Sequence, residues 1–189
     1  VALLAMQARD YDAAEKQLTR ILELNYKDPD VVRYYLGQLN EERKRYDEAL
    51  KWYGQVAQGE QYINARSRHA GVLAKQGKLP EAREHLQQAT ANSNQQRAQL
   101  TQAEAALLRE ANDYQAAYEL LGRALEKIPN SPDLPYDHAM AAEKVNRLDV
   151  LEGNLKRLIK LRPDHAHAYN ALGYTFADRN ERIEEAHAL

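Results

Sequence analysis

The sequence predicts an all-α protein made of repeated pairs of helices, and three observations support this fold class. The same pattern of apolar residues occurs six times, and each occurrence begins with a small or apolar residue. The first residues of successive occurrences are 35, 33, 35, 34 and 35 positions apart. These positions are Ala14, Ala49, Ala82, Ala117, Leu151 and Ala186. Further apolar residues follow each position at helical spacing, and the composition, 29% charged and 44% hydrophobic, fits amphipathic helices. A period of about 34 residues is typical of stacked helix pairs.

The copies follow one another without a linker, so the whole chain is predicted to form one continuous array. They comprise residues 1–28 (partial), 29–60, 61–94, 95–130, 131–163 and 164–189 (partial). In the clearest copy, Asn112-Asp113 joins the two helices, and Pro129 ends the second because proline cannot continue the hydrogen-bond ladder.

The sixth copy is expected to turn at residues 178–182 and to open its second helix at Ile183. Both terminal copies are incomplete and lack the polar caps that such arrays need. We therefore interpret the chain as a fragment of a longer protein.

Residues at fixed places in these copies resemble the tetratricopeptide repeat family. In that family the first helix carries a Leu-Gly pair, and the second carries Ala, a large apolar residue, Ala and then Pro. The matching residues are Leu36-Gly37 and Leu172-Gly173 in first helices, and Ala117, Leu121, Ala124 and Pro129 in a second helix. The resemblance implies a right-handed superhelical solenoid of about five to six copies. Small residues such as Ala117 and Gly173 are expected where helices cross closely.

Charge and composition exclude several function classes. The 26 Lys and Arg residues nearly balance the 28 Asp and Glu residues, and the longest basic run is Arg43-Lys44-Arg45, so no nucleic-acid partner is predicted. The chain contains no cysteine for disulfide or thiol chemistry. No apolar run approaches about 18 residues, so no direct membrane insertion is expected.

The sequence also offers no catalytic constellation, and we predict that the chain is not an enzyme and binds no cofactor or metal. Glu41-Glu42 and Glu184-Glu185 are adjacent on helices, where neighbouring side chains diverge by about 100°. His165 and His167 lie two residues apart, a spacing that points them away from each other, unlike helical metal ligands four residues apart.

The resemblance places a partner-binding groove on the concave face, lined mainly by first helices. The groove positions correspond to Tyr34, Gln38, Glu41, Asn64, Ser67, Lys75, Gln99, Gln102, Arg109, Tyr136, Met140, Glu143, His167, Asn170 and Tyr174. Amide and tyrosine side chains suit recognition of a peptide main chain, so the expected partner is a protein or extended peptide, bound with little salt dependence. Alternatively, several of these tyrosines only cover neighbouring helices.

This lining differs from the family's carboxylate clamp, which uses Lys, Asn and Arg. The corresponding places here hold Tyr34, Gln38, Ser67 and Arg68.

The last copy carries a narrower resemblance. Residues 167–179, with 182–186 after them, are similar to repeats of proteobacterial outer-membrane lipoproteins. One such group is the adaptor that partners a periplasmic carboxyl-terminal processing protease and delivers cell-wall hydrolases to it. This resemblance implies a periplasmic adaptor anchored to the outer membrane; otherwise a cytoplasmic location is expected. The alternative function is a regulatory or substrate-recruiting module of a larger enzyme whose catalytic domain lies outside these residues.

Overall fold

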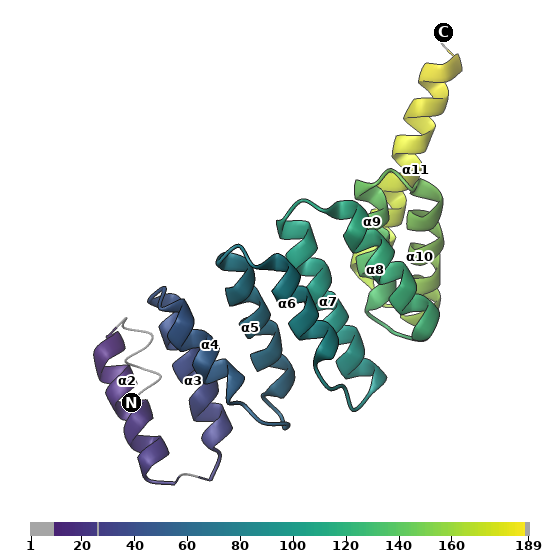
Figure 1. Ribbon diagram of the computed structural model, residues 1–189. Helices are drawn as coiled ribbons and strands as arrows, with labels where there is room; N and C mark the ends of the chain where they lie inside the picture. The colour runs from purple at the N-terminus through teal and green to yellow at the C-terminus, as the bar shows by residue number, and fades with distance from the viewer. Residues whose placement is uncertain (1–9, 26, 188–189) are drawn as a thin grey trace. The chain divides into compact units, whose positions relative to one another are not determined.

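The computed structural model describes the backbone of residues 10–25 and 27–187 and the side chains up to residue 177. Within these residues all regular secondary structure is helical, which confirms the predicted fold class (Figure 1). The helices are α2 (Tyr11–Glu23), α3 (Pro29–Glu42), α4 (Tyr46–Gly54), α5 (Tyr62–Lys75), α6 (Leu79–Gln88), α7 (Asn94–Glu110), α8 (Tyr114–Lys127), α9 (Leu134–Lys144), α10 (Leu148–Leu161) and α11 (Ala166–His187).

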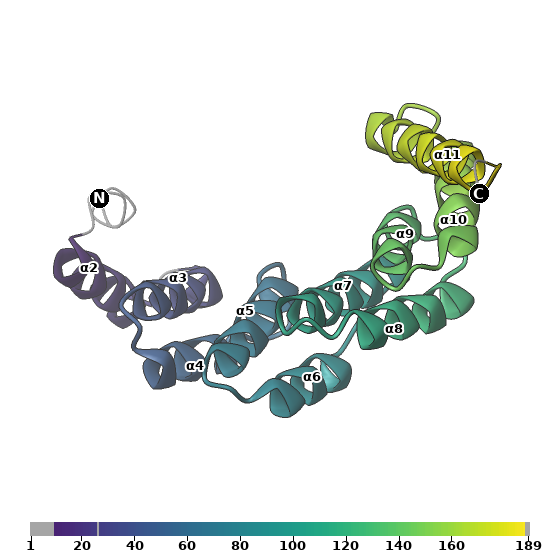
Figure 2. The ribbon, with the colours of Figure 1, turned by 90° about the horizontal axis from the view of Figure 1, so that it is seen from above.

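The chain divides into two compact units, which we call unit 1 (Val1–Thr90) and unit 2 (Ala91–Leu189). In unit 1 each helix from α2 to α6 packs against the next one along the chain. In unit 2 the same holds from α7 to α11. Figure 2 shows that the first helices α3 and α5 lie on one side of unit 1 and the second helices α4 and α6 on the other. The pairs α3–α4, α5–α6, α7–α8 and α9–α10 are the predicted copies two to five.

The turns inside these four pairs share one backbone conformation. Each contains one residue with positive φ: Lys44 (57°), Gly77 (77°), Asn112 (60°) and Asn146 (59°). The N–H of the following residue donates to a carbonyl five residues earlier, as Arg45 does to Asn40 at 2.8 Å. The equivalent bonds run from Lys78 to Leu73, Asp113 to Leu108 and Arg147 to Ala142. This is the Schellman closure, which satisfies helix-terminal carbonyls and reverses the chain.

The turn predicted at residues 178–182 is wrong, because α11 continues through it to His187. Asn180 stands one repeat period after Asn146 and is the equivalent residue for a positive φ. Nothing in this stretch forces the helix to stop, since it contains neither glycine nor proline. Asparagine is compatible with helical backbone as well as with positive φ, so this residue alone does not impose a turn.

Close helix crossings fall at small residues, but not at all of those expected. Ala117 is fully buried, as predicted. Gly173 is exposed, and a Cβ there would meet nothing within 4 Å, so its expected role in a crossing is wrong. The tightest place is Gly37, where a Cβ would lie 2.5 Å from the Cδ1 atom of Tyr53. Gly37 therefore makes room for the Tyr53 ring between α3 and α4.

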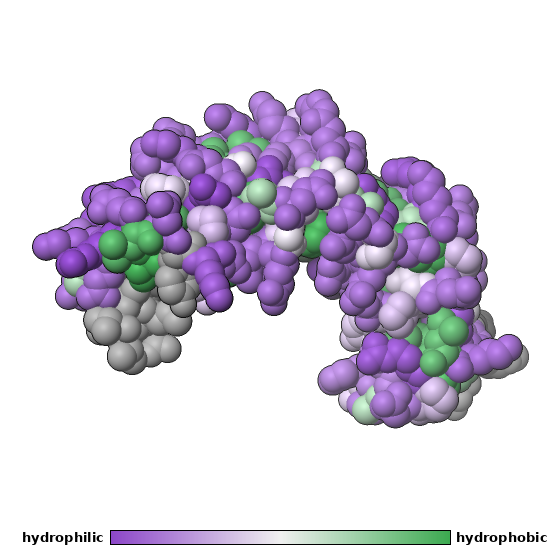
Figure 3. All heavy atoms as spheres, turned by 90° about the horizontal axis from the view of Figure 1, so that it is seen from below, coloured by the Kyte–Doolittle hydropathy of each residue, from purple (hydrophilic) through white to green (hydrophobic). Residues whose placement is uncertain are grey.

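The surface of the described residues is mostly polar. On the face shown in Figure 3, hydrophilic residues predominate and hydrophobic ones form small separate areas. The exposed large hydrophobic residues include Leu24, Leu161, Tyr169, Tyr174 and Phe176. Polar and charged side chains are therefore the main candidates for recognition.

Candidate protein-binding site

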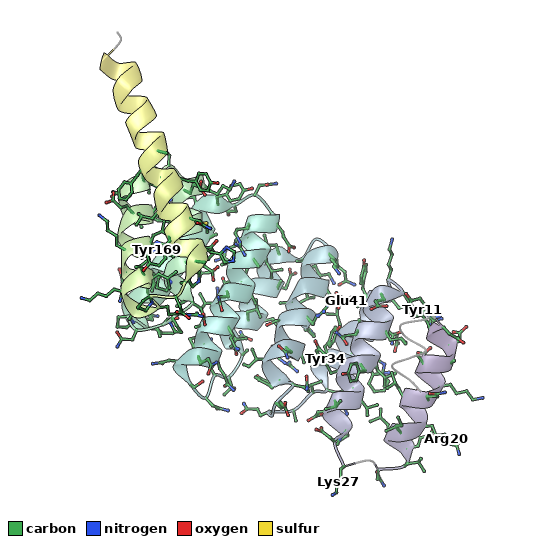
Figure 4. The ribbon with its side chains drawn as sticks, turned by 180° about the vertical axis from the view of Figure 1, so that it is seen from behind. Tyr11, Arg20, Lys27, Tyr34, Glu41 and Tyr169 are labelled. Atoms are coloured by element: carbon green, nitrogen blue, oxygen red, sulfur yellow. The ribbon has the colours of Figure 1, made fainter. Side chains whose placement is uncertain are left out.

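The first-helix residues of unit 1 gather around one carboxylate. Tyr34, Gln38 and Glu41 follow each other at positions i, i+4 and i+7 of α3, and so share one face of that helix. Figure 4 labels Tyr34 and Glu41 along this helix. They lie beside residues of α4 and α5. We call the whole set the Glu41 cluster; it consists of Tyr34, Gln38, Glu41, Tyr53, Arg68 and Lys75.

Glu41 is the centre of this cluster because three side chains from two other helices contact its carboxylate. The Tyr53 hydroxyl donates to Oε2 at 2.7 Å, and Lys75 Nζ donates to Oε1 at 2.8 Å. Arg68 Nη1 lies 3.6 Å from Oε2. Only 9% of the Glu41 side chain is exposed, whereas Arg68 and Lys75 are 48% and 52% exposed. Glu41 therefore holds two half-exposed cations side by side on the surface of α5.

Burial and hydrogen bonding set the protonation states in the cluster. Burial raises the pKa of the Tyr53 hydroxyl, and the hydrogen bond to Glu41 and its negative charge raise it further, so Tyr53 stays a donor. Burial lowers the pKa of the Arg68 guanidinium, but the charge of Glu41 and the Tyr53 and Tyr34 hydroxyls outweigh it, and the pKa lies above its usual value. Tyr53 is therefore neutral, and the formal charges of the cluster are those of Glu41, Arg68 and Lys75.

Tyrosine rings complete the surface next to these charges. The Tyr34 ring lies 5.8 Å from that of Tyr53 and 6.0 Å from that of Tyr35, both inclined contacts measured between ring centroids. Gln38 Nε2 donates to the Tyr34 hydroxyl at 3.4 Å. Tyr34 is half-buried, so it both packs against the helix pair and presents part of its ring.

Sequence reasoning placed four members of the cluster in the groove, named Arg68 only as a residue at a place that corresponds to the carboxylate clamp, and missed Tyr53. Arg68 lies seven residues before Lys75, a helical spacing that could have indicated a shared face of α5. Of the other α5 residues expected in the groove, Asn64 is exposed and Ser67 is half-buried. Neither of them contacts Glu41 in the described part of the chain.

The predicted groove residues of unit 2 are more dispersed. Gln102 Nε2 on α7 donates to Asp137 Oδ2 on α9 at 2.6 Å, which joins two first helices. Tyr136 and Met140 are half-buried and pack against the hydrophobic core, the alternative role considered for the tyrosine. The remaining predicted residues are exposed: Gln99, Arg109, Glu143, His167, Asn170 and Tyr174.

The histidines form ring contacts. His165 lies between Tyr136 and His167, with centroid distances of 5.5 and 6.2 Å, and its Nδ1 accepts from the Ala168 N–H at 3.2 Å. The expectation that His165 and His167 point apart is wrong, because His165 precedes the first residue of α11 and is not helical. His69 and His85 stack at 3.9 Å between α5 and α6. Within the described residues no three potential ligands gather into a metal site, and no helix is long and apolar enough to cross a membrane.

The regular turns and helix pairs agree with a direct family comparison. The tetratricopeptide repeat family model matches residues 2–62 and 68–132. The chain belongs to the tetratricopeptide repeat family. It is also 37% identical over 160 residues to the TPR repeat-containing protein PA4667 of Pseudomonas aeruginosa, an alignment that covers 85% of this chain. The chain spans 27% of the length of that relative.

Solved structures of tetratricopeptide proteins share this fold. The chain superimposes on YrrB, described as a TPR protein with an unusual peptide-binding site, with a TM-score of 0.52 and 20% identity over 90% of this chain and 87% of that one. A MamA crystal structure gives a TM-score of 0.55 at 17% identity, over 79% of this chain and 87% of that one. Such likeness establishes the fold. The tetratricopeptide fold is that of a protein-interaction scaffold, and its members are generally non-catalytic.

Proposed function

We propose that this chain is a non-catalytic scaffold that binds a partner protein or extended peptide on its first helices, with the Glu41 cluster as the main contact in unit 1. One observation carries the proposal. Glu41 uses both carboxylate oxygens inside the cluster and leaves Arg68 and Lys75 half exposed and fixed in place. A surface with its charges already positioned loses less side-chain entropy on binding.

The chemistry of the cluster favours one kind of partner. A guanidinium has five N–H donors and an ammonium three, so Arg68 and Lys75 keep donors for a ligand after contacting Glu41. The net positive charge of the cluster favours a segment with an acidic side chain. The exposed part of Tyr34 supplies a flat surface for the adjoining main chain. The fitting ligand is an extended peptide segment with at least one Asp or Glu.

Selection from a displayed library of random extended peptides, followed by calorimetric titration with a selected peptide, tests this function. We expect selected peptides to contain an acidic residue and to lose roughly tenfold in affinity with Arg68→Ala or Lys75→Ala. Arg20→Ala is the control, because Arg20 is an exposed arginine on the second helix α2 and lies outside the predicted groove residues. Equal affinities for the Arg68, Lys75 and Arg20 variants would show that the cluster is not part of the binding face.

We also propose that the longer protein is an adaptor that delivers substrates to a periplasmic carboxyl-terminal processing protease. The resemblance of residues 167–179 to adaptor lipoproteins supports this finer function. The test is a degradation assay with the purified protease and a cell-wall hydrolase, with and without the full-length protein. Faster degradation is expected in its presence, and an unchanged rate would refute the adaptor role while leaving the scaffold proposal intact.

A further inference from the structure

A hollow of about 760 Å³ lies between the second helices α8 and α10 of unit 2, away from the residues expected in the groove. Gly122 on α8 and Gly153 on α10 both line it. Because neither has a side chain, the two helices leave an open slot between them. Tyr118, Leu125 and Val150 supply its apolar walls. The volume lies within the range of about 300 to 1,000 Å³ that is usual for ligand sites.

His138 of α9 forms the polar floor of this slot. Its side chain is nearly buried, with 9% exposed, and its ring stacks on that of Tyr118 at 4.8 Å. The amide of Asn154 lies 3.0 Å from Nδ1. The other nitrogen, Nε2, points toward α8, because a Cβ added to Gly122 would lie only 3.2 Å from it. No described residue bonds to Nε2, so one polar atom of the floor is available to a ligand.

The hydrogen bond from Asn154 determines what Nε2 offers. With the Asn154 amide donating to Nδ1, the proton of a neutral imidazole resides on Nε2, which then donates. Burial lowers the pKa of His138, while the Asn154 bond raises it less, so the ring is neutral at physiological pH. The floor therefore presents one uncharged N–H donor.

The rim of the slot carries balanced charge. Two glutamates and two arginines line it: Glu119, Glu126, Arg123 and Arg157. Arg123 lies 3.9 Å from Glu119, and Arg157 donates to the Pro129 carbonyl. Because these charges cancel, the slot has no net attraction for an ion, and an uncharged acceptor suits its floor better than a carboxylate or phosphate.

We propose that this slot binds an extended peptide segment, with one backbone carbonyl accepting the Nε2 proton of His138 and one aliphatic or aromatic side chain between Gly122 and Gly153. The surface of unit 2 would thereby hold a second peptide site, made by the second helices α8 and α10 with His138 of the first helix α9 as its floor. It is separate from the first-helix face and does not depend on it.

The minimal probes are N-acetyl-leucine N-methylamide and N-acetyl-phenylalanine N-methylamide, titrated into isotope-labelled protein and followed by NMR. We expect saturable shifts at the amides of Gly122, Val150 and Gly153 and at the His138 ring nitrogens. Sodium acetate, tested in parallel, is expected to give no saturable shift. Saturation by acetate but not by the two amides would overturn the proposal.

Two variants make the test specific. Gly153→Leu should fold, because a Cβ there meets nothing within 4 Å, and should weaken amide binding at least roughly tenfold by filling the slot. Gly173→Leu is its matched control and should retain binding, because Gly173 is an exposed glycine of α11 outside the slot and an added Cβ there also meets nothing within 4 Å. His138→Phe keeps a ring next to Tyr118, removes the donor and should weaken binding by a similar factor. No saturable shift in the unmodified protein, or binding unaffected by Gly153→Leu, would overturn the proposal.

Discussion

The first helices of units 1 and 2 carry oppositely charged residues at the same repeat positions, yet only unit 1 pairs them. Glu41 and Lys75 are one repeat period apart and lie 2.8 Å from each other. Arg109 and Glu143 are also one period apart and also opposite in sign, but both are exposed and form no ion pair within the described residues. Equal spacing and opposite charge are therefore not sufficient to build a cluster.

The difference lies in the second helix of each pair. Tyr53, on the second helix after Glu41, reaches the carboxylate with its hydroxyl at 2.7 Å. Leu155 stands at the same offset from Glu143, is fully buried and has no donor. A buried hydroxyl can hold a carboxylate against a helix pair by donating a hydrogen bond to it. A leucine has no donor, so the carboxylate remains hydrated at the surface. The comparison shows that a residue of the core decides whether the surface residue becomes fixed.

The largest expected effect comes from breaking the Gly37–Tyr53 contact. Gly37→Ala would place a methyl group 2.5 Å from Cδ1 of the Tyr53 ring and should lower the free energy of unfolding by about 3 kcal/mol through overpacking. Gly173→Ala, with no neighbour within 4 Å, should be neutral or raise stability by about 0.5 to 1 kcal/mol, because alanine favours helix more than glycine. Urea denaturation of both variants measures this, and similar losses would contradict the packing described here.

Acid should weaken unit 1 through the stacked pair of His69 and His85. The pKa of each is lowered to about 4, and burial is the largest cause for both; the charge of His85 and then that of Arg66 also lower the pKa of His69, and the charge of Arg66 also lowers that of His85. Because the unfolded value is 6.5, the unfolded chain takes up protons first as the pH falls. Stability is thus fully present above pH 6.5 and is lost progressively down to about pH 4.

The expected loss over this window is about 2 kcal/mol for the pair, after allowing for partial solvent screening. Denaturation curves at a series of pH values measure it. The variant His69→Phe/His85→Phe should flatten the pH dependence, whereas His167→Phe, at an exposed position, should leave it unchanged. A pH dependence that survives in the double variant would assign the acid sensitivity to other groups.

Removing the Tyr53 hydroxyl should make unit 1 resemble unit 2 at this position. Tyr53→Phe keeps the ring over Gly37 but leaves a largely buried carboxylate without its shortest hydrogen bond, and should cost about 1.5 kcal/mol. Tyr114→Phe is the matched control, because the Tyr114 hydroxyl bonds to the exposed Asn112 and its loss should cost little. Thermal unfolding compares the two, and equal shifts would show that Glu41 does not depend on Tyr53.

The smallest expected effect concerns salt. Peptide binding to unit 1 should weaken a few-fold as ionic strength rises, because the exposed charges of Arg68 and Lys75 are screened over about 10 Å at 0.1 M. This replaces the little salt dependence that the sequence predicts for a mostly uncharged lining. Little change is expected for ligands of the unit 2 slot, whose charges are balanced. Calorimetry with a selected acidic peptide, repeated with Arg68→Ala/Lys75→Ala, checks whether the salt dependence disappears with these cations.

The sequence by itself determined the repeat period, the helix pairs from α3 to α10 and most of their turns. These features depend on signals only a few residues apart: apolar spacing, capping residues, and glycine or asparagine where φ must be positive, as at Gly77 and Asn112. The resemblance to the tetratricopeptide repeat family pointed to the groove positions Tyr34, Gln38 and Glu41, which share one helical face because they are three and four residues apart.

Only the tertiary structure decided how those positions are used. Tyr53 reaches Glu41 from the second helix of the same pair, whereas Arg68 and Lys75 reach it from the next copy, and no periodic pattern shows which of them will meet. Tertiary packing likewise decided three features that the sequence pattern did not show: the exposure of Gly173, the tight contact at Gly37 and the continuation of α11. Each depends on whether another helix packs over the residue, and a repeat sequence determines local conformation much more directly than the contacts between neighbouring copies.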